Sequence, residues 1–250
     1  MTKNDQPLVQ PKDILLAVSL LTRLPVEADH ATRGSLAVWA YPLAGLVPAA
    51  LAVLVGLFAQ WLGLPAPICA LLALAAMIAT TGAMHEDGLA DTADGFWGGW
   101  TVERRLEIMK DSQIGAYGVV GLILAFGLRW AALTWLFEAE LAAGAILAAA
   151  VISRASMPVL MATLPHARKT GLSHSVGTVG TPSAAIAIVL AFVLGVLILG
   201  SGVFWAVIWA GLLTAGIGMT AQRKINGQTG DVLGCAQQVT EIAVLLTLVG

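Results

Sequence analysis

Long apolar stretches separated by short polar connections dominate the chain from residue 43 onward. Uninterrupted apolar segments of about 18 residues are typical of helices that cross a bilayer. An earlier apolar segment, Ile14–Leu24, is short and is expected to be interfacial or half-inserted. The pattern predicts an all-α fold, a polytopic transmembrane helical bundle with about seven spans: Leu43–Leu64, Ile68–Met84, Gly115–Phe137, Leu141–Leu164, Ala184–Gly200, Val203–Ala221 and Val232–Val249.

Composition supports the membrane assignment. Of 250 residues, 58% are hydrophobic and 11% are charged, and the mean hydropathy is +0.85. A soluble domain carries about 25% charged residues, and its surface could not be covered with so few polar groups. We expect residues 1–250 to form a single integral membrane domain. Cys69 and Cys235 lie in or beside apolar segments and lack the spacing of a disulfide framework or metal site.

Lysine and arginine alternate between successive connections. They occur in the region up to Arg33 and in the connections His85–Ile114, Pro165–Pro182 and Gln222–Asp231, and they are absent from the connections in between. The positive-inside rule places such positive loops in the cytoplasm. The remaining connections are too short to build a site, so we expect the active site to face the cytoplasm.

The most unusual polar feature is the run from His85 to Asp94, which reads His-Glu-Asp-Gly-Leu-Ala-Asp-Thr-Ala-Asp. Asp87, Asp91 and Asp94 are spaced i, i+4 and i+7, so their carboxylates share one face of a helix that would extend the span Ile68–Met84. Such carboxylates repel one another unless a cation lies nearby, and oxygen ligands suit Mg²⁺. The alternative is a solvated acidic helix end. The spacing favours a metal site at the membrane surface.

Other residues near this run are candidates for the same site. His85 is a possible general base, phosphate donor or support for a metal ligand, or else a polar residue at the membrane boundary. Glu86 lies off the carboxylate face and is a weaker metal candidate. Asp111 and Asp231 are candidate further ligands, unless each only caps the helix that follows it.

Two segments are suited to bind phosphate. A short amphipathic surface helix is expected over Val102–Lys110, with Thr101 as its N-cap, and it carries Arg104 and Arg105. The glycine-rich connection Asn226–Asp231 opens directly into a helix, where backbone N–H groups can receive a phosphate.

Three charged residues lie within the predicted spans. Arg129, Arg154 and Glu241 are unfavourable in lipid and should face the interior of the bundle. Arg154 either balances Glu241 or reaches the phosphate of a ligand.

Taken together, these residues resemble the cobalamin synthase family, also called adenosylcobinamide-GDP ribazoletransferase. The aspartate-rich run and the Gly-Gln-Thr-Gly-Asp loop are the specific motifs. The matching segments follow the family's order and cover nearly the whole chain: Thr22-Arg23-Leu24-Pro25, Tyr41-Pro42-Leu43, His85 to Gly95, Leu106 to Ser112, Ser153-Arg154, Ala167-Arg168 with Gly171-Leu172, and Gly227-Gln228-Thr229-Gly230-Asp231.

The resemblance implies a Mg²⁺-dependent phosphotransferase of the bacterial cytoplasmic (inner) membrane. It would join adenosylcobinamide-GDP to α-ribazole, or to its 5′-phosphate, giving adenosylcobalamin, or its 5′-phosphate, and GMP. The partners would be these substrates and the lipid bilayer, without nucleic acid and with a homo-oligomer left open. The implied catalytic residues are Asp87, Asp91, Asp94 and His85, and the implied metal ligands are Asp87, Asp91, Asp94, Asp111 and Asp231. The implied substrate contacts are Arg104, Arg105, Arg154, Arg168, Gln228, Thr229 and Gly230.

Two other functions stay open on the sequence. A CDP-alcohol phosphotransferase-like enzyme begins its site with Asp-x-x-Asp-Gly, which Asp91 to Gly95 satisfies, but the Ala-Arg pair and the later aspartates of that family are absent. A cation-coupled transporter would need acids near the middle of the membrane, where only Glu241 is expected.

Overall fold

The computed structural model describes residues 7–28 and 33–249, and its regular elements there are helices, as the sequence predicted. Helices occur at all seven long apolar segments. The elements are α1 (Lys12–Leu21), η2 (Ala37–Ala40), α3 (Tyr41–Trp61), α4 (Ala66–Thr81), α5 (Met84–Gly98), α6 (Val102–Ile108), α7 (Ala116–Glu138), α8 (Ala142–Thr163), α9 (Leu172–Val176), α10 (Thr181–Leu199), η3 (Gly200–Gly202), α11 (Val203–Ile225) and α12 (Gly230–Thr247).

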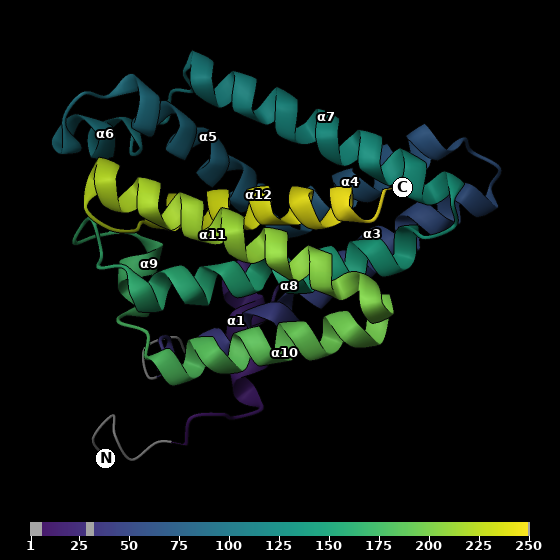
Figure 1. Ribbon diagram of the computed structural model, residues 1–250, viewed down its shortest axis with the longest axis horizontal. Helices are drawn as coiled ribbons and strands as arrows, with labels where there is room; N and C mark the ends of the chain where they lie inside the picture. Colours follow the sequence, from purple (N-terminus) through teal and green to yellow (C-terminus); the bar gives the residue numbers. More distant parts are fainter. Residues whose placement is uncertain (1–6, 29–32, 250) are drawn as a thin grey trace.

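Length and apolar character identify four candidate membrane spans in the described residues: Ala37–Trp61, Ala116–Glu138, Ala142–Thr163 and Thr181–Ile225. The last comprises α10 and α11, which fold back on each other at η3 and run antiparallel (Figure 1). The bent pair α4 and α5 is a fifth candidate. The polytopic membrane fold is therefore confirmed.

Helix α12 is predicted as a span but is not among these candidates. It runs through the bundle and packs against α5, α8 and α11 (Figure 1). Its polar residues Gln237, Gln238, Thr240 and Glu241 lower its hydropathy, and all of them are buried. These side chains face protein rather than lipid, which is the position that polar groups require inside a membrane bundle.

The connections lie at two opposite ends of the bundle. Helices α6 and α9 and the connection between α11 and α12 lie at one end, on the left of Figure 1. The connections after α3, α7 and α10 lie at the other end. The Lys- and Arg-bearing loops after α5, α8 and α11 therefore share one end, as their alternation along the chain predicts.

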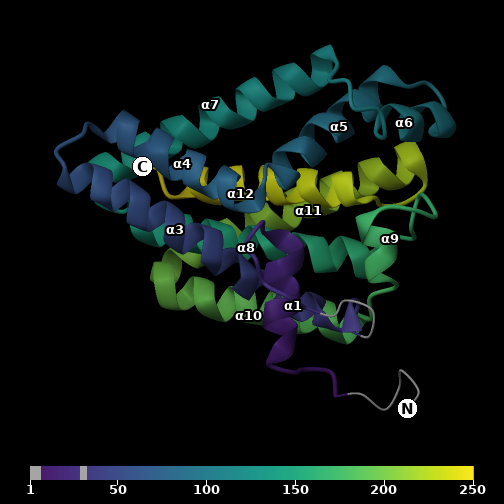
Figure 2. The ribbon, with the colours of Figure 1, turned by 180° about the vertical axis from the view of Figure 1, so that it is seen from behind.

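Helix α1 lies across the bundle instead of along it (Figure 2). The buried Asp13 carboxylate accepts hydrogen bonds from Arg33 Nε at 2.7 Å and from Trp39 Nε1 at 2.8 Å, which ties α1 to the region of η2. A helix of this length rises only about 15 Å, roughly half the hydrocarbon core of a bilayer. The short segment Ile14–Leu24 is therefore not a span.

The acidic helix α5 is not a straight extension of α4, and that prediction was wrong. Gly82 and Ala83 both adopt left-handed backbone conformations, at φ 66° and 58°, and the chain turns by 86° between the two helices. A Cβ atom on Gly82 would collide with the Arg23 side chain, so the bend needs a glycine there. The turn directs α5 between α7 and α12.

Candidate functional site

The site is built where α5 crosses α12. Gly88 and Gly234 lie at the crossing: a Cβ atom on Gly88 would be 2.8 Å from the carbonyl oxygen of Asp231, and one on Gly234 would be 3.3 Å from the Cα of His85. Helices approach this closely only where small residues meet. The two glycines therefore bring the acidic run into contact with the start of α12, more than 140 residues later in the chain.

Three aspartates at this crossing form a group that we call the acidic cluster: Asp87, Asp91 and Asp231. The carboxylate of Asp91 is repelled by the negative charges of Asp87 and Asp231 and by that of the nearby Asp94. Asp87 is exposed, while Asp91 and Asp231 are half-buried. Neither Asp87 nor Asp91 has a side-chain hydrogen bond or ion pair within residues 7–28 and 33–249, so their oxygens are free to bind a ligand.

The donor set of the acidic cluster fits Mg²⁺. This ion prefers oxygen ligands, keeps several waters and binds through one or two carboxylates together with substrate phosphates. In the described part of the chain, no group of three or more His, Cys, Asp or Glu side chains is placed to hold a metal ion by itself. A cation at the acidic cluster would therefore need water and substrate phosphate oxygens to complete its shell, with Asp87, Asp91 and Asp231 as the candidate protein ligands.

The Asp94 carboxylate bonds to the start of α7, which its i+7 spacing from Asp87 does not predict. Its Oδ2 accepts the N–H of Gly115 at 2.7 Å and its Oδ1 accepts the N–H of Gly118 at 2.9 Å. Asp94 is thus a buried cap for the N-terminus of α7, where free N–H groups and the helix dipole favour a carboxylate. Because both oxygens are engaged, we assign Asp94 to holding α5 against α7 rather than to binding metal.

The loop between α8 and α9 reaches over to Asp231. Arg168 Nη2 donates a hydrogen bond to Asp231 Oδ2 at 2.9 Å, and the Thr229 hydroxyl donates to the same oxygen at 3.2 Å. Arg168 Nη1 is buried and has no hydrogen-bond partner among the described residues. This arm of the guanidinium therefore has unused hydrogen-bonding capacity beside the acidic cluster, and the contact of Arg168 with a substrate phosphate stays a prediction.

The same loop pairs with the glycine-rich connection before α12. His166 and Gln228 form an isolated parallel β-bridge, and the Gln228 side chain donates to His166 Nδ1 at 2.9 Å and accepts from the Ser173 hydroxyl at 2.7 Å. Burial lowers the pKa of His166, and the neighbouring His174 acts in the same direction, so a neutral ring accepts this bond. Gln228 is therefore a structural link between two loops.

Thr229 is the N-cap of α12, since its hydroxyl accepts the N–H of Val232 at 3.3 Å. The alternative that Asp231 is the cap is therefore wrong. The side chains of Gln228 and Thr229, both implied as substrate contacts, bond to the protein instead. Gly230, half-buried in the first turn of α12, can offer a substrate only its backbone.

The groups on and after α6 lie apart from the acidic cluster. Thr101 caps α6 as predicted, by accepting the N–H of Arg104 at 3.2 Å. The exposed Arg104 pairs with Glu107 at 2.7 Å, while Arg105 Nη1 donates to the carbonyl oxygen of Lys224 at 3.0 Å and joins α6 to α11. Asp111 is exposed, and its carboxylate accepts the N–H of Gln113 at 3.2 Å. None of these contacts, in the described residues, links the two arginines or Asp111 to the acidic cluster.

The sequence of the chain matches known proteins over nearly its whole length. Residues 13–249 match the family described as cobalamin-5-phosphate synthase, CobS. The chain belongs to the cobalamin-5-phosphate synthase family.

Individual members of the cobalamin-5-phosphate synthase family are similar to this chain over nearly its whole length. A Bradyrhizobium diazoefficiens protein named adenosylcobinamide-GDP ribazoletransferase is 45% identical over 238 residues, which cover 94% of this chain and 92% of that protein. A protein of the same name from Mesorhizobium japonicum is 42% identical, and the match covers 94% of this chain and 91% of that protein. Another from Brucella anthropi is 41% identical, and the match covers 95% of this chain and 96% of that protein. No solved structure matches the chain.

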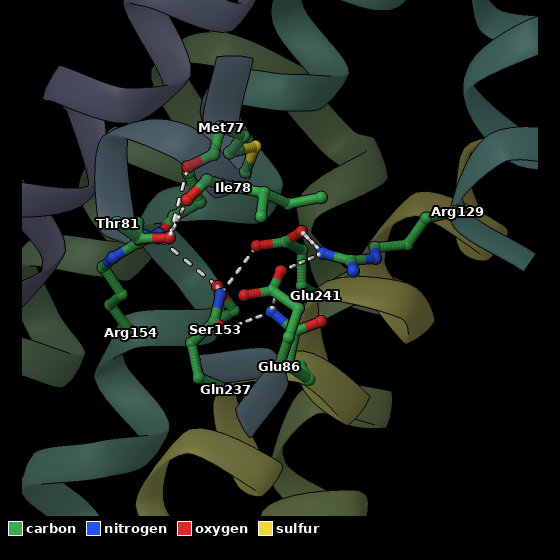
Figure 3. A network of polar contacts seen from close by, with 11 residues as sticks. Met77, Ile78, Thr81, Glu86, Arg129, Ser153, Arg154, Gln237 and Glu241 are labelled. Atoms are coloured by element: carbon green, nitrogen blue, oxygen red, sulfur yellow. Dashed lines mark hydrogen bonds and ion pairs between the residues drawn. The ribbon is translucent and has the colours of Figure 1, made fainter. Parts of the chain in front are cut away.

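This cobalamin-5-phosphate synthase family member also contains a buried polar network (Figure 3). Arg129 Nη1 donates to Glu86 at 3.0 Å and to Glu241 at 3.4 Å. Gln237 donates to Glu241 at 2.6 Å and to the Ser153 hydroxyl at 3.0 Å. The network joins α5, α7, α8 and α12. Glu241 is ion-paired in this network and is therefore not a free carboxylate.

Arg154 belongs to this network and not to the acidic cluster. Its guanidinium donates to the carbonyl oxygen of Ala150 at 3.1 Å, is almost fully buried and lies in the field of Glu241 and Glu86. The alternative that Arg154 balances Glu241 therefore fits, whereas a substrate phosphate contact does not. His85 is also buried, on the side of α5 that faces α12, and its Nε2 has no hydrogen-bond partner among the described residues.

Proposed function

We propose that this chain is an adenosylcobinamide-GDP ribazoletransferase. It joins adenosylcobinamide-GDP to α-ribazole, or to its 5′-phosphate, and yields adenosylcobalamin, or its 5′-phosphate, with release of GMP. Family membership and the names of full-length relatives support this proposal. The structural observation that carries it is the acidic cluster, in which carboxylates of α5 and α12 lie beside a free arm of the Arg168 guanidinium.

The geometry supports separate roles in phosphoryl transfer for the carboxylates and for Arg168. A bound Mg²⁺ would neutralise charge on the pyrophosphate and on the departing GMP phosphate. Asp87, Asp91 and Asp231 would hold this cation, and Arg168 would bind a phosphate oxygen. The hydroxyl of α-ribazole attacks the phosphorus attached to cobinamide, a carboxylate of the cluster accepts its proton, and the bond to GMP breaks.

We also propose that the acidic cluster faces the cytoplasm of a bacterial inner membrane. The start of α12, which carries Asp231, and the loop before α9, which carries Arg168, lie at the end of the bundle that has the Lys- and Arg-bearing loops. Soluble, highly charged substrates would reach it from that side.

The direct test of the reaction is GMP release by purified protein in lipid. Adenosylcobinamide-GDP and α-ribazole are incubated with Mg²⁺ or with EDTA, and GMP is measured by mass spectrometry. We expect GMP only when both substrates and Mg²⁺ are present. Absence of GMP with both substrates would contradict the proposed reaction, and undiminished release in EDTA would contradict its metal dependence.

Replacement of Gly88 by Ala should reduce this reaction strongly. The new methyl group would lie 2.8 Å from the carbonyl oxygen of Asp231, so α5 and α12 must separate and the cluster must open. Displacements of about 1 Å can reduce turnover about 100-fold. The matched control is Gly98→Ala on the same helix, where the methyl group would lie 3.6 Å from Ile108 and in ordinary contact. Equal rates for the two variants would argue against a role for the close crossing.

A further inference from the structure

An apolar groove follows one face of α11 and is lined by residues of α8, α10 and α11. Figure 1 shows how these three helices are arranged. Its volume is about 690 Å³, within the range of about 300–1,000 Å³ that is typical of small-molecule sites. Residues of α11 line it from Val207 to Arg223, which corresponds to about 24 Å along the helix axis. Gly211 leaves part of this face open, because a Cβ atom there would have no neighbour within 4 Å.

The groove changes from apolar to cationic along its length. Val207 and Phe192 line its inner part, whereas Gln222 and Arg223 line the end at the last turn of α11. Arg223 is exposed and has no hydrogen-bond or ion-pair partner among the described residues. Its neighbour Lys224, in contrast, donates to the carbonyl oxygen of Phe96 at 3.0 Å. A free cation therefore terminates the groove at the end of the bundle that carries the acidic cluster.

The dimensions and polarity of the groove match a lipid of one leaflet. A bilayer with its headgroups is about 40–45 Å thick, so one leaflet measures about 20–22 Å, close to the length of the groove. An apolar channel among spanning helices suits an acyl chain, and a guanidinium at headgroup depth suits a phosphate. We propose that this groove binds an anionic phospholipid, with an acyl chain along α11 and its headgroup phosphate at Arg223.

Such a lipid would lie beside contacts that hold the helices of the site. The carbonyl oxygen of Lys224 accepts the hydrogen bond from Arg105 on α6, and its ammonium bonds to the end of α5. The phosphate would therefore be one residue away from the junction of α5, α6 and α11. The proposal concerns binding, and it does not depend on the identity of the reaction.

The test is native mass spectrometry of the purified full-length protein with equimolar phosphatidylglycerol and phosphatidylcholine of identical acyl chains. The wild type should retain one phosphatidylglycerol with a preference of about five-fold. Arg223→Gln should still retain lipid but bind the two headgroups about equally. Gly211→Phe, which fills the groove, should lower bound phosphatidylglycerol by about ten-fold or more.

The matched control is Gly216→Phe on the same helix. A Cβ atom on Gly216 also has no neighbour within 4 Å, but this residue does not line the groove, so lipid binding should equal that of the wild type. Ala215→Phe, also in the groove, replaces Gly211→Phe if the latter does not fold. Wild-type lipid binding in the groove-filling variant, or no headgroup preference in the wild type, would overturn the proposal. So would a dimer that Gly211→Phe dissociates, or displacement of the lipid by adenosylcobinamide-GDP.

Discussion

Replacement of Asp91 by Asn is expected to lower Mg²⁺-dependent GMP release at least about 100-fold. Asp91 is the member of the acidic cluster that experiences the charge of Asp87, Asp231 and Asp94, and its oxygens have no partner in the described part of the chain. An amide would remove the charge that attracts the cation. The measurement is the initial rate of GMP formation over a range of Mg²⁺ concentrations.

Stability should separate this functional effect from misfolding. Asp91→Asn relieves repulsion among neighbouring carboxylates, so without Mg²⁺ its thermal unfolding midpoint should equal or exceed that of the wild type. Glu103→Gln, an exposed carboxylate on α6, is the matched control and should retain wild-type turnover. Normal turnover in Asp91→Asn, or a marked loss of stability with it, would count against the assigned role.

Replacement of Arg129 by Leu is expected to destabilise the protein by about 3–5 kcal/mol. Arg129 is the ion-pair partner of both Glu86 and Glu241, and the three side chains are nearly inaccessible to solvent. Leucine would remove the ion pair of both buried carboxylates and leave Arg154 as the cation near them. For a chain of this size, such a loss corresponds to a fall of about 10 °C in the unfolding midpoint in detergent.

The matched control for this prediction is Arg104→Leu. Arg104 also forms an ion pair, with Glu107, but both side chains are more than half exposed, and exposed pairs contribute little to stability. A double variant with Arg129→Leu and Glu86→Gln should recover part of the loss, because one uncompensated charge is removed. Equal midpoints for Arg129→Leu and Arg104→Leu would show that the buried network is not a stabilising element.

Most of the fold could be predicted from apolar length, because a membrane span needs a run of apolar residues whatever surrounds it. The chain has helices at all seven such runs. The bend between α4 and α5 could not be predicted this way. It depends on Gly82, Ala83 and the position of Arg23, which comes from a distant part of the sequence. Hydropathy likewise does not reveal that α12 is surrounded by protein.

Helical spacing predicts only the part of the site that lies on a single helix, α5. The spacing of Asp87 and Asp91 places them on one side of α5, but the same spacing could not reveal that Asp94 caps α7. Asp231 joins the cluster through the contact of Gly88 with α12, which only a tertiary structure contains. The roles of Arg154 and Gln228 were obscured for the same reason, since their partners lie in other helices and loops.

The central claim is that the carboxylates at the crossing of α5 and α12 hold the divalent cation of the reaction. Electron paramagnetic resonance with Mn²⁺, which accepts the same oxygen ligands as Mg²⁺, tests it directly in the purified protein. We expect saturable Mn²⁺ binding in the wild type and in Glu103→Gln, and its loss in Asp91→Asn and Asp231→Asn. Mn²⁺ binding of wild-type affinity in the two cluster variants would contradict the account.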